Sequence, residues 1–285
     1  MLCYWNGQYV PREAVSISPD DRGFLFADGL YDVVRAYDGH LFRLADHLER
    51  LARGARALAF RRTDFAELAE VASTLLLRND LLNGDATFYV QVTRGAAPRS
   101  HAFPSAETPL TVYATVKPFT PLPAKAENGV AVISVPDMRW RLCSIKTTAL
   151  TWNVMANQRA KEAGVEEAMF FRDGKLTEGS HTNVLIVRDG AVVSPVADES
   201  ILDGITRRAV LELCRAEGIA VVERDVSQEE VAEQADEVML VGTTTEVMPV
   251  IALDGRPVGG GAPGPVTRRL QQLFRGEVAR ASQEG

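Results

Sequence analysis

The chain has 285 residues, of which 46% are hydrophobic and 24% are charged, so it can form a large core and is not a disordered polyelectrolyte. Its formal net charge is −7, with 31 Lys and Arg against 38 Asp and Glu, and this excludes a basic surface that would neutralise nucleic-acid phosphates. No stretch reaches the run of about 20 apolar residues that crosses a bilayer, and the first residues lack the pattern of a signal peptide. Three cysteines, Cys3, Cys143 and Cys214, are too scattered for a disulfide framework or a metal site. We therefore expect a cytoplasmic protein without metal, membrane or nucleic-acid partners.

Strands and helices are both expected in the N-terminal part. Residues 29–44 predict two strands around Asp38-Gly39, a dipeptide suited to the positive φ angles of a hairpin turn. Apolar side chains three and four residues apart predict an amphipathic helix over 45–60, and a second helix is expected within 63–80, its start left open. Two β-branched and aromatic runs predict central strands. These runs are 86–95 and 109–119.

A linker is predicted at residues 120–129, TPLPAKAENG, where two prolines and small polar residues interrupt the strand pattern. It separates a small N-terminal α/β domain, residues 1–119, from a larger C-terminal domain, residues 130–285. The mixture of helices with mostly hairpin-connected strands predicts an α/β (α+β) fold of two domains.

The C-terminal part again alternates strands and helices. Two strand pairs are predicted, each turning at an Asp-Gly dipeptide. One helix is expected to end at Gly218, a usual C-terminal stop, and another to begin with Ser227 and Glu230 as a capping box. The expected elements are a strand at 130–135, a helix near 152–163, strand pairs at 167–179 and 183–195, a helix at 205–218 and a helical start at 227–237.

A proline-edged loop at residues 95–104, GAAPRSHAFP, places Arg99 and His101 two positions apart. The chain contains only 4 histidines, and no acidic residue follows in the loop before Glu107. The pair is either solvated surface or a cationic grip on an anion, and the loop alone does not decide between them.

Lys146 is the only charged residue between Arg141 and Arg159. An apolar setting of this kind favours the neutral amine, which attacks carbonyl groups. The alternative is a lysine that extends from a half-buried strand end to solvent.

Three further segments are weak signals when taken singly. Glu178, in LTEGSHTNV, could orient the ring nitrogen of a cofactor or accept hydrogen bonds in a turn. Gly204 precedes a helix that opens at Ile205-Thr206, and free N–H groups at a helix start can bind an anion. Thr243, in VGTTTEV, follows an apolar strand and could complete a phosphate site or end the strand.

In combination and in this order, these segments resemble the fold type IV pyridoxal-phosphate enzymes. That family includes branched-chain aminotransferases, D-amino acid aminotransferases and aminodeoxychorismate lyase. Four blocks are most similar to the D-amino acid aminotransferases, and the resemblance runs from YWNGQYV to TRRLQQLF, nearly the whole chain. The blocks are DRGFLFADGLYDVVRAYDG, FYVQVTRGAAPRSHAFP, DMRWRLCSIK and GTTTEVMPVIALDG. The resemblance implies two α/β domains with the active site at their interface.

The resemblance also implies how pyridoxal 5'-phosphate would be held. Lys146 corresponds to the lysine that binds the cofactor covalently and later moves the substrate proton. Glu178 corresponds to the carboxylate that pairs with the protonated pyridine nitrogen. Leu202 corresponds to the apolar residue against the ring face. The residues implied to hold the phosphate are Arg50, Ile205, Thr206 and Thr243.

Arg99, His101 and Tyr31 correspond to the residues that grip the substrate α-carboxylate in the D-specific members. In those enzymes the Arg-x-His loop reaches into the neighbouring subunit, so the resemblance implies a homodimer. The implied reaction moves the amino group of D-alanine or a related D-amino acid to a 2-oxo acid such as 2-oxoglutarate.

Two positions depart from the pattern of the family. His181 stands where a small hydroxyl residue is expected near the phosphate or substrate, and residues 147–152 lack an expected asparagine. The alternatives are a branched-chain L-amino acid or (R)-amine aminotransferase, aminodeoxychorismate lyase, or a non-catalytic relative that kept the fold.

Overall fold

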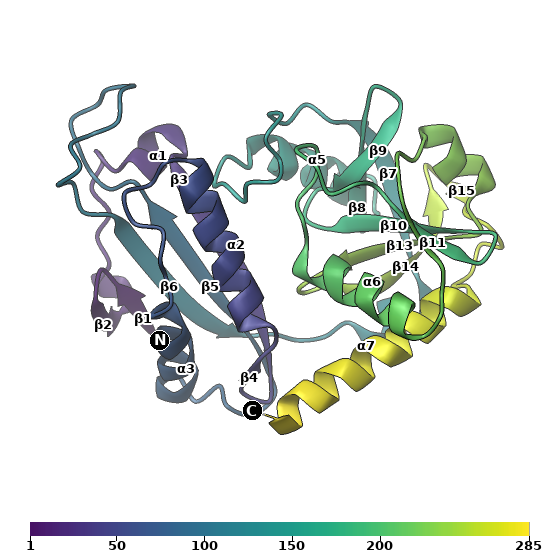
Figure 1. Cartoon of the computed structure of the whole chain (residues 1–285), viewed down its shortest axis with the longest axis horizontal. Coiled ribbons are helices and arrows are strands. Elements are labelled where there is room, and N and C mark those ends of the chain that lie inside the picture. Colours follow the sequence, from purple (N-terminus) through teal and green to yellow (C-terminus); the bar gives the residue numbers. More distant parts are fainter. Residues whose placement is uncertain (285) are drawn as a thin grey trace. The chain divides into compact units, whose positions relative to one another are not determined.

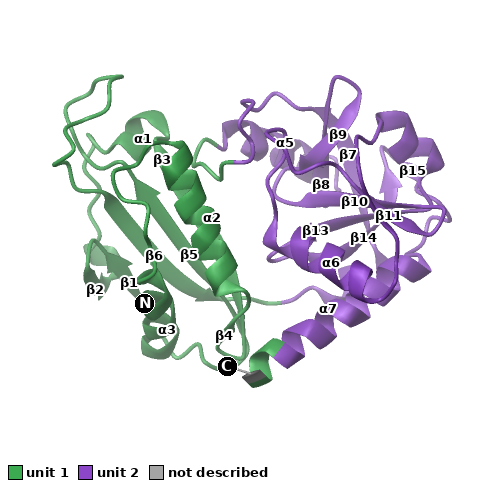
Figure 2. Cartoon of the chain, viewed as in Figure 1, with its two compact units in different colours: residues 1–120, 145–149, 281–285 green, residues 121–144, 150–280 purple. Residues whose placement is uncertain are grey.

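The computed structural model describes residues 1–284, and the chain divides into two compact units (Figure 2). Unit 1 contains Met1–Thr120, Ile145–Ala149 and the last residues from Ala281, and unit 2 contains Pro121–Ser144 and Leu150–Arg280.

Lys146 therefore belongs to unit 1, whereas the sequence placed it in a domain of residues 130–285. The physical reason is backbone pairing with the strand that begins at Gly29. The N–H of Tyr31 donates to the carbonyl of Lys146 at 3.1 Å, and the N–H of Thr148 donates to the carbonyl of Gly29 at 3.0 Å. These bonds attach the segment to the sheet of unit 1.

Unit 1 is built on a six-stranded antiparallel sheet in the order β2-β1-β6-β5-β3-β4 (Figure 1). Its strands are β1 (Leu2–Trp5), β2 (Gln8–Pro11), β3 (Gly29–Tyr37), β4 (His40–Leu41), β5 (Asp85–Thr93) and β6 (Thr111–Pro118). Its helices are η1 (Arg12–Ala14, a 3-10 turn), α1 (Arg22–Phe26), α2 (Leu44–Ala57) and α3 (Leu68–Arg78).

The expected hairpin, the helix near 45–60 and both central strands of unit 1 are confirmed. Asp38 and Gly39 form the turn between β3 and β4 with φ angles of 46° and 81°. The second helix begins only at Leu68, within the predicted range of 63–80 but after its first residues. Phe65 precedes this helix. It is 2% exposed and belongs to the core of unit 1.

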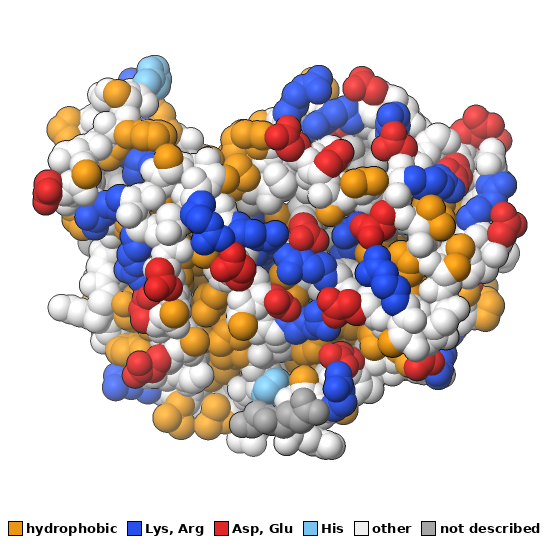
Figure 3. Space-filling view, viewed as in Figure 1, with side chains coloured by type: hydrophobic (Ala, Val, Ile, Leu, Met, Phe, Trp, Pro, Cys, Tyr) orange, Lys and Arg blue, Asp and Glu red, His pale blue; other side chains and the backbone are white. Residues whose placement is uncertain are grey.

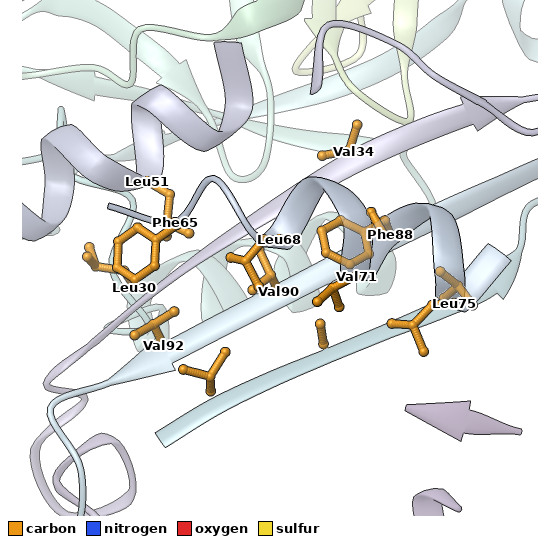
Figure 4. Packing of buried hydrophobic residues seen from close by; sticks show 14 of the residues in the cluster. Leu30, Val34, Leu51, Phe65, Leu68, Val71, Leu75, Phe88, Val90 and Val92 are labelled. Carbon is orange, nitrogen blue, oxygen red and sulfur yellow. The ribbon is translucent and has the colours of Figure 1, made fainter. Parts of the chain in front are cut away.

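The core of unit 1 lies between its sheet and the helices α2 and α3. Figure 4 shows side chains of α3 packed against side chains of β5 in this core. Members of the cluster that are labelled there include Leu68, Val71 and Leu75 from α3 and Phe88, Val90 and Val92 from β5. Removing such side chains from water stabilises a fold in proportion to the apolar area buried, so this core gives β3 and α2 fixed positions.

Unit 2 is built on a nine-stranded mixed sheet in the order β12-β11-β10-β13-β14-β7-β8-β9, with β15 paired to β14. The pairs β7·β8, β7·β14 and β11·β12 are parallel and the others antiparallel. Its strands are β7 (Val130–Pro136), β8 (Glu167–Arg172), β9 (Lys175–Gly179), β10 (Asn183–Arg188), β11 (Ala191–Ser194), β12 (Val221–Glu223), β13 (Glu237–Gly242), β14 (Glu246–Leu253) and β15 (Arg256–Pro257). Its helical elements are α4 (Pro123–Asn128), α5 (Thr151–Glu162), α6 (Ile205–Ala216), η2 (Glu230–Gln234, a π-helical turn) and α7 (Pro265–Glu284).

Both Asp-Gly hairpins, the helix ending before Gly218 and the Ser227 cap of the predicted C-terminal part are confirmed. The Oγ of Ser227 accepts a hydrogen bond from the N–H of Glu230 at 3.0 Å. The expected linker differs, because most of it forms the helix α4 within unit 2. Pro123 starts this helix, and a proline fits the first helical turn because its missing N–H has no partner there.

Three connections of unit 2 come together at one edge of its sheet: the β9–β10 turn, the start of α6 and the turn after β13. Asn183 pairs with Val241, so β10 begins where β13 ends. A Cβ atom at Gly242 would lie 3.5 Å from the Cγ2 of Thr182, and one at Gly204 would overlap the Oδ1 of Asn183. Glycine is required at position 204 because the chain passes so close to this amide.

Lysine and arginine side chains are interspersed with aspartate and glutamate on the face shown in Figure 3. Over residues 1–284, no helix is both long and apolar enough to cross a membrane. Cys3, Cys143 and Cys214 are all buried free thiols.

Candidate active site

Lys146 lies beside Tyr31 in unit 1. The Nζ of Lys146 is 4.4 Å from the centre of the Tyr31 ring, and both side chains are partly buried. The backbone bond between the two residues fixes the lysine to the first residues of β3. The structure thus brings together two of the residues that the sequence singled out.

Arg50 belongs to a buried ionic network with Asp32 and His47. The guanidinium donates from Nε to Asp32 Oδ2 at 2.9 Å and from Nη2 to Asp32 Oδ1 at 2.7 Å. His47 Nδ1 lies 2.7 Å from the same Oδ1. Asp32 and His47 are 1% and 2% exposed. Sequence reasoning identified Arg50 but missed both Asp32 and His47. His47 could have been found, because it lies three residues before Arg50 on the same helix face.

The charge states in this network follow from burial and from the charges that face each group. Burial raises the pKa of Asp32, but the Arg50 guanidinium and His47 outweigh it and hold that pKa well below its usual range. Burial lowers the pKa of His47, and Arg50 and Lys146 lower it further against the raising effect of Asp32. His47 is therefore a neutral imidazole whose Nδ1–H donates to the Asp32 carboxylate.

Arg99 and His101 lie on an exposed loop between β5 and β6. The ring of Phe26 contacts both: its centre is 5.2 Å from Arg99 Cζ and 5.6 Å from the centre of the His101 ring. Among residues 1–284 of a single chain, no hydrogen bond or ring contact joins either side chain to Tyr31. The structure brings the Arg99 and His101 side chains together on one aromatic ring but does not bring them to Tyr31.

Glu178, the last residue but one of β9, is 6% exposed and both of its oxygens are engaged. Oε1 forms an ion pair with Nη1 of Arg139. Oε2 accepts from Asn183 Nδ2 and from the backbone N–H of Leu202, each at 3.0 Å. Asn183 also donates to the carbonyl of Leu202 at 2.8 Å, so one amide ties Glu178 to the chain before α6.

Arg139 links Glu178 to a second buried carboxylate. It donates to Asp137 from Nε at 2.9 Å and from Nη2 at 2.8 Å. Burial lowers the pKa of Arg139, but the hydrogen bonds to Asp137 and the charges of Glu178 and Asp137 raise it above its ordinary value. Arg139 therefore presents a permanent positive charge to Glu178 and favours its ionised form. Sequence reasoning missed Arg139, Asp137 and Asn183.

The helix α6 begins at the edge of the unit 2 sheet where the β9–β10 turn and the turn after β13 also lie. Its N-cap is Gly204, which has no side chain to accept a hydrogen bond from that turn. Ile205 and Thr206 are 2% and 5% exposed. Thr243 is partly buried in the turn between β13 and β14. A helix dipole, free N–H groups and a hydroxyl are a donor set that fits a phosphate group.

His181 lies on the β9–β10 turn and is held by a buried carboxylate. Its Nδ1 is 2.8 Å from Glu167 Oε2, and the Glu167 side chain is fully buried. Glu167 also accepts from the N–H of Ser180 at 3.0 Å and from Thr182 Oγ1 at 3.1 Å. Burial raises the pKa of Glu167, but the His181 imidazole and Ser180 lower it below its usual value. The ionised Glu167 side chain therefore holds His181 together with its neighbours in the turn, Ser180 and Thr182.

The segment 147–152, the second departure noted in the sequence, is divided between the units. Thr147–Ala149 lie in unit 1, where Thr148 Oγ1 donates to the carbonyl of Ala27 at 3.0 Å. Thr151 begins α5 in unit 2. The hydroxyl of Thr148 therefore helps to hold the Lys146 segment against the sheet of unit 1.

Comparison with known proteins identifies the family. The family description "Amino-transferase class IV" matches residues 29–253. The chain is 39% identical to a D-alanine aminotransferase of Bacillus licheniformis over 98% of its length and 97% of that protein. It is 38% identical to a D-alanine aminotransferase of Staphylococcus haemolyticus, covering 94% of this chain and 95% of that one.

A solved structure with the same fold carries a form of the cofactor. It is a branched-chain amino acid aminotransferase of T.th. with pyridoxamine 5'-phosphate, with a TM-score of 0.88 and 25% identity over 97% of this chain and 93% of that one. The buried carboxylate and the donor set at the start of α6, both in unit 2, fit pyridoxal phosphate, and the lysine of unit 1, taken by itself, is of a type that fits it too. The chain belongs to the class IV aminotransferases, which are pyridoxal-phosphate-dependent enzymes of fold type IV.

Proposed function

We propose that this aminotransferase is a D-amino acid transaminase, which moves the amino group of D-alanine or a related D-amino acid to a 2-oxo acid such as 2-oxoglutarate. The observation that carries the proposal is the placement of Arg99 and His101 around Phe26 on the β5–β6 loop. A guanidinium beside an imidazole donor suits a carboxylate. The full-length similarity to D-alanine aminotransferases supports the choice of substrate.

The residues assigned to the cofactor follow the resemblance to the family. Pyridoxal phosphate supplies an electron sink for the bond that breaks at the substrate α-carbon. Lys146 would bind the cofactor and would move a proton at that carbon. Leu202 would lie against its ring. The residues assigned to the phosphate are Arg50, Ile205, Thr206 and Thr243.

Glu178 is assigned to the ring nitrogen, where an ionised carboxylate favours the protonated form. Its contacts with Arg139, Asn183 and the N–H of Leu202 keep it ionised and fix its direction. Because these donors already surround it, the carboxylate reorganises little when it accepts a further proton-bearing nitrogen.

Asp32 and His47 support the phosphate site through Arg50. Two hydrogen bonds from the guanidinium to Asp32 hold its plane, and neutral His47 fixes Asp32 in turn. The ionised Asp32 also compensates the buried charge of Arg50, which would be costly alone.

The stereochemistry follows from where the carboxylate is held. Lys146 would deliver its proton from one side, so the direction in which the substrate carboxylate is held would decide the handedness of the product. Tyr31, Arg99 and His101 are assigned to that carboxylate, and they select the D arrangement.

We further infer a homodimer in the cytoplasm. The loop carries Arg99 and His101 on an exposed segment, which suits a role in the site of a second copy, and two-fold symmetry is the usual arrangement. Three buried free thiols suit a reducing compartment. Sedimentation should show a dimer, and a fully active monomer would contradict the role given to the loop.

A stereochemical assay tests the function. Purified holoenzyme is incubated with 2-oxoglutarate and either D-alanine or L-alanine, and pyruvate formation is followed. We expect activity with D-alanine and little with the L form. Activity with L-valine or L-leucine in place of D-alanine would instead support a branched-chain specificity, which the fold shared with the branched-chain enzyme also accommodates.

A further inference from the structure

The loop that carries Arg99 and His101 is exposed but anchored. Every residue from Pro98 to Phe103 is exposed, and the segment forms no helix or strand. Such a loop would sample many conformations and would lose conformational entropy on binding a substrate. Its contacts with the short helix α1 restrict it instead.

Arg22, the first residue of α1, makes the central contact. It is 4% exposed although it carries a full positive charge. Its Nη1 donates to the carbonyl of Ser100 at 2.7 Å and to that of Ala102 at 3.3 Å. These two carbonyls flank His101, so one guanidinium holds the backbone on both sides of the histidine.

Asp28 fixes the other side of the Arg22 guanidinium. Its Oδ2 accepts from Arg22 Nε at 2.8 Å and from Arg94 Nε at 2.8 Å. Arg94 in turn donates to the carbonyls of Leu58 and Ala59, at 2.8 and 3.0 Å, just after α2. Asp28 thereby connects the loop to rigid parts of unit 1, and Arg94 also contacts the loop directly, with its Cζ 3.8 Å from the centre of the Phe103 ring.

Phe26 places the two functional side chains of the loop on one surface. Its ring centre lies 4.9 Å from Arg22 Cζ and 5.2 Å from Arg99 Cζ. The His101 ring lies 5.6 Å away, tilted by 52°. The aromatic face attracts cations, so it draws Arg99 into a defined direction.

We propose that Arg22 is a positioning residue that holds the Arg99–His101 loop in the conformation that receives the substrate carboxylate. The proposal rests on the function assigned to that loop above. Arg22 acts through the backbone of Ser100 and Ala102 and does not itself bind substrate. A loop held in its binding conformation before the substrate arrives avoids an ordering cost at each binding event.

The test compares Arg22→Met with Arg35→Met in the holoenzyme. Arg35 is a matched control, because it is also a buried arginine of unit 1, 3% exposed and paired with Asp85 at 2.5 Å, and its aromatic contacts with Tyr37 and Phe119 lie outside the loop. We expect Arg22→Met to raise the KM for D-alanine by about 10- to 100-fold, the equivalent of a hydrogen bond from a charged group, with the visible cofactor band retained. Arg35→Met should lower the unfolding temperature without this change in KM.

A combined variant separates positioning from general damage. Because Arg22 acts through Arg99 and His101 together, adding Arg22→Met to the pair Arg99→Ala and His101→Ala should be little worse than that pair alone. The proposal would be overturned if the increases in KM for D-alanine multiplied in the combined variant. An unchanged KM in Arg22→Met would overturn it as well. Arg22→Lys should recover part of the loss, because it keeps the charge at Asp28 but not the planar set of donors.

Trypsin provides a measurement that does not depend on activity. Cleavage after Arg99 requires the loop to leave its anchored conformation, so it should be faster in Arg22→Met than in the wild type or in Arg35→Met. Equal cleavage, including none in any of them, would contradict the proposal. If the wild type does not act on D-alanine, the proposed function fails, and the cleavage rates alone decide whether Arg22 holds the loop.

Discussion

His47 predicts a specific dependence of stability on pH. Burial lowers its pKa below the ordinary value of 6.5, so the folded protein binds its proton less readily than the unfolded chain does. The stabilising contribution is fully present above 6.5 and is lost as the pH falls from there through the lowered folded value. Acidification should therefore destabilise the fold well before the carboxylates titrate.

The magnitude follows from linkage. For an imidazole that stays neutral in the folded protein down to pH 5, the free energy of unfolding falls by up to about 2 kcal/mol between pH 7 and pH 5. The charged groups that face His47 are Asp32, Arg50 and Lys146, of which the first raises its pKa and the other two lower it. The figure is an upper limit because any protonation of folded His47 reduces it.

The experiment uses His47→Asn, whose side-chain amide can donate to Asp32 from nearly the same place as Nδ1. His40→Asn is the control, since His40 lies on β4 and is only half-buried. Urea denaturation is measured at pH 7 and at pH 5. Between these values the free energy of unfolding of the wild type and of the control should fall by up to about 2 kcal/mol more than that of His47→Asn. Equal losses in all three proteins would refute the neutral, buried imidazole.

Three further changes test other parts of the site. Borohydride reduction of the holoenzyme should fix the cofactor on Lys146, and a peptide map that finds it on another lysine would contradict this assignment. Glu178→Gln should keep the cofactor bound but slow removal of the α-proton by about 10²- to 10³-fold, because an electrostatic contact at the developing charge is lost; near-normal rates in a stopped-flow half-reaction would rule out its role. Asp32→Asn removes the ionised carboxylate that pairs with the buried guanidinium of Arg50, and urea denaturation should show a loss of about 3 to 5 kcal/mol in the free energy of unfolding. A loss below about 1 kcal/mol would mean that the pair does not act as described.

The elements of the fold were largely predictable because their signals are local. Asp-Gly turns between β-branched runs specify hairpins, and the stripe of apolar residues in α2 specifies a surface helix. The placement of Ile145–Ala149 was not predictable, because it depends on backbone bonds to Gly29 and Tyr31, far earlier in the chain. No local pattern records such a pairing.

The same distinction explains which residues of the site were found. Lys146 and Glu178 stand in short segments with a recognisable composition, so the sequence indicated them, whereas Arg50 was indicated only by the resemblance to the fold type IV enzymes. Their partners are distant in sequence: Asp32 is 18 residues from Arg50, and Arg139 is 39 residues from Glu178. A sequence that contains many residues of both charges does not indicate which of them form ion pairs in the folded protein.

The partners nevertheless determine what the predicted residues can do. A buried carboxylate without a partner shifts its pKa upwards and becomes neutral, and a buried arginine without a partner keeps its charge at a high cost in stability. The proposed roles need Glu178 ionised and Arg50 buried and charged. The structure supplies each with a buried group of opposite sign and a third group that fixes the pair, His47 in one case and Asp137 in the other. A charge held in this way costs no reorganisation when the ligand binds, which is the condition for a preorganised electrostatic site. Substitutions at these partners should therefore resemble weakened versions of substitutions at Arg50 and Glu178 themselves, although none of the partners is assigned a contact with substrate or cofactor.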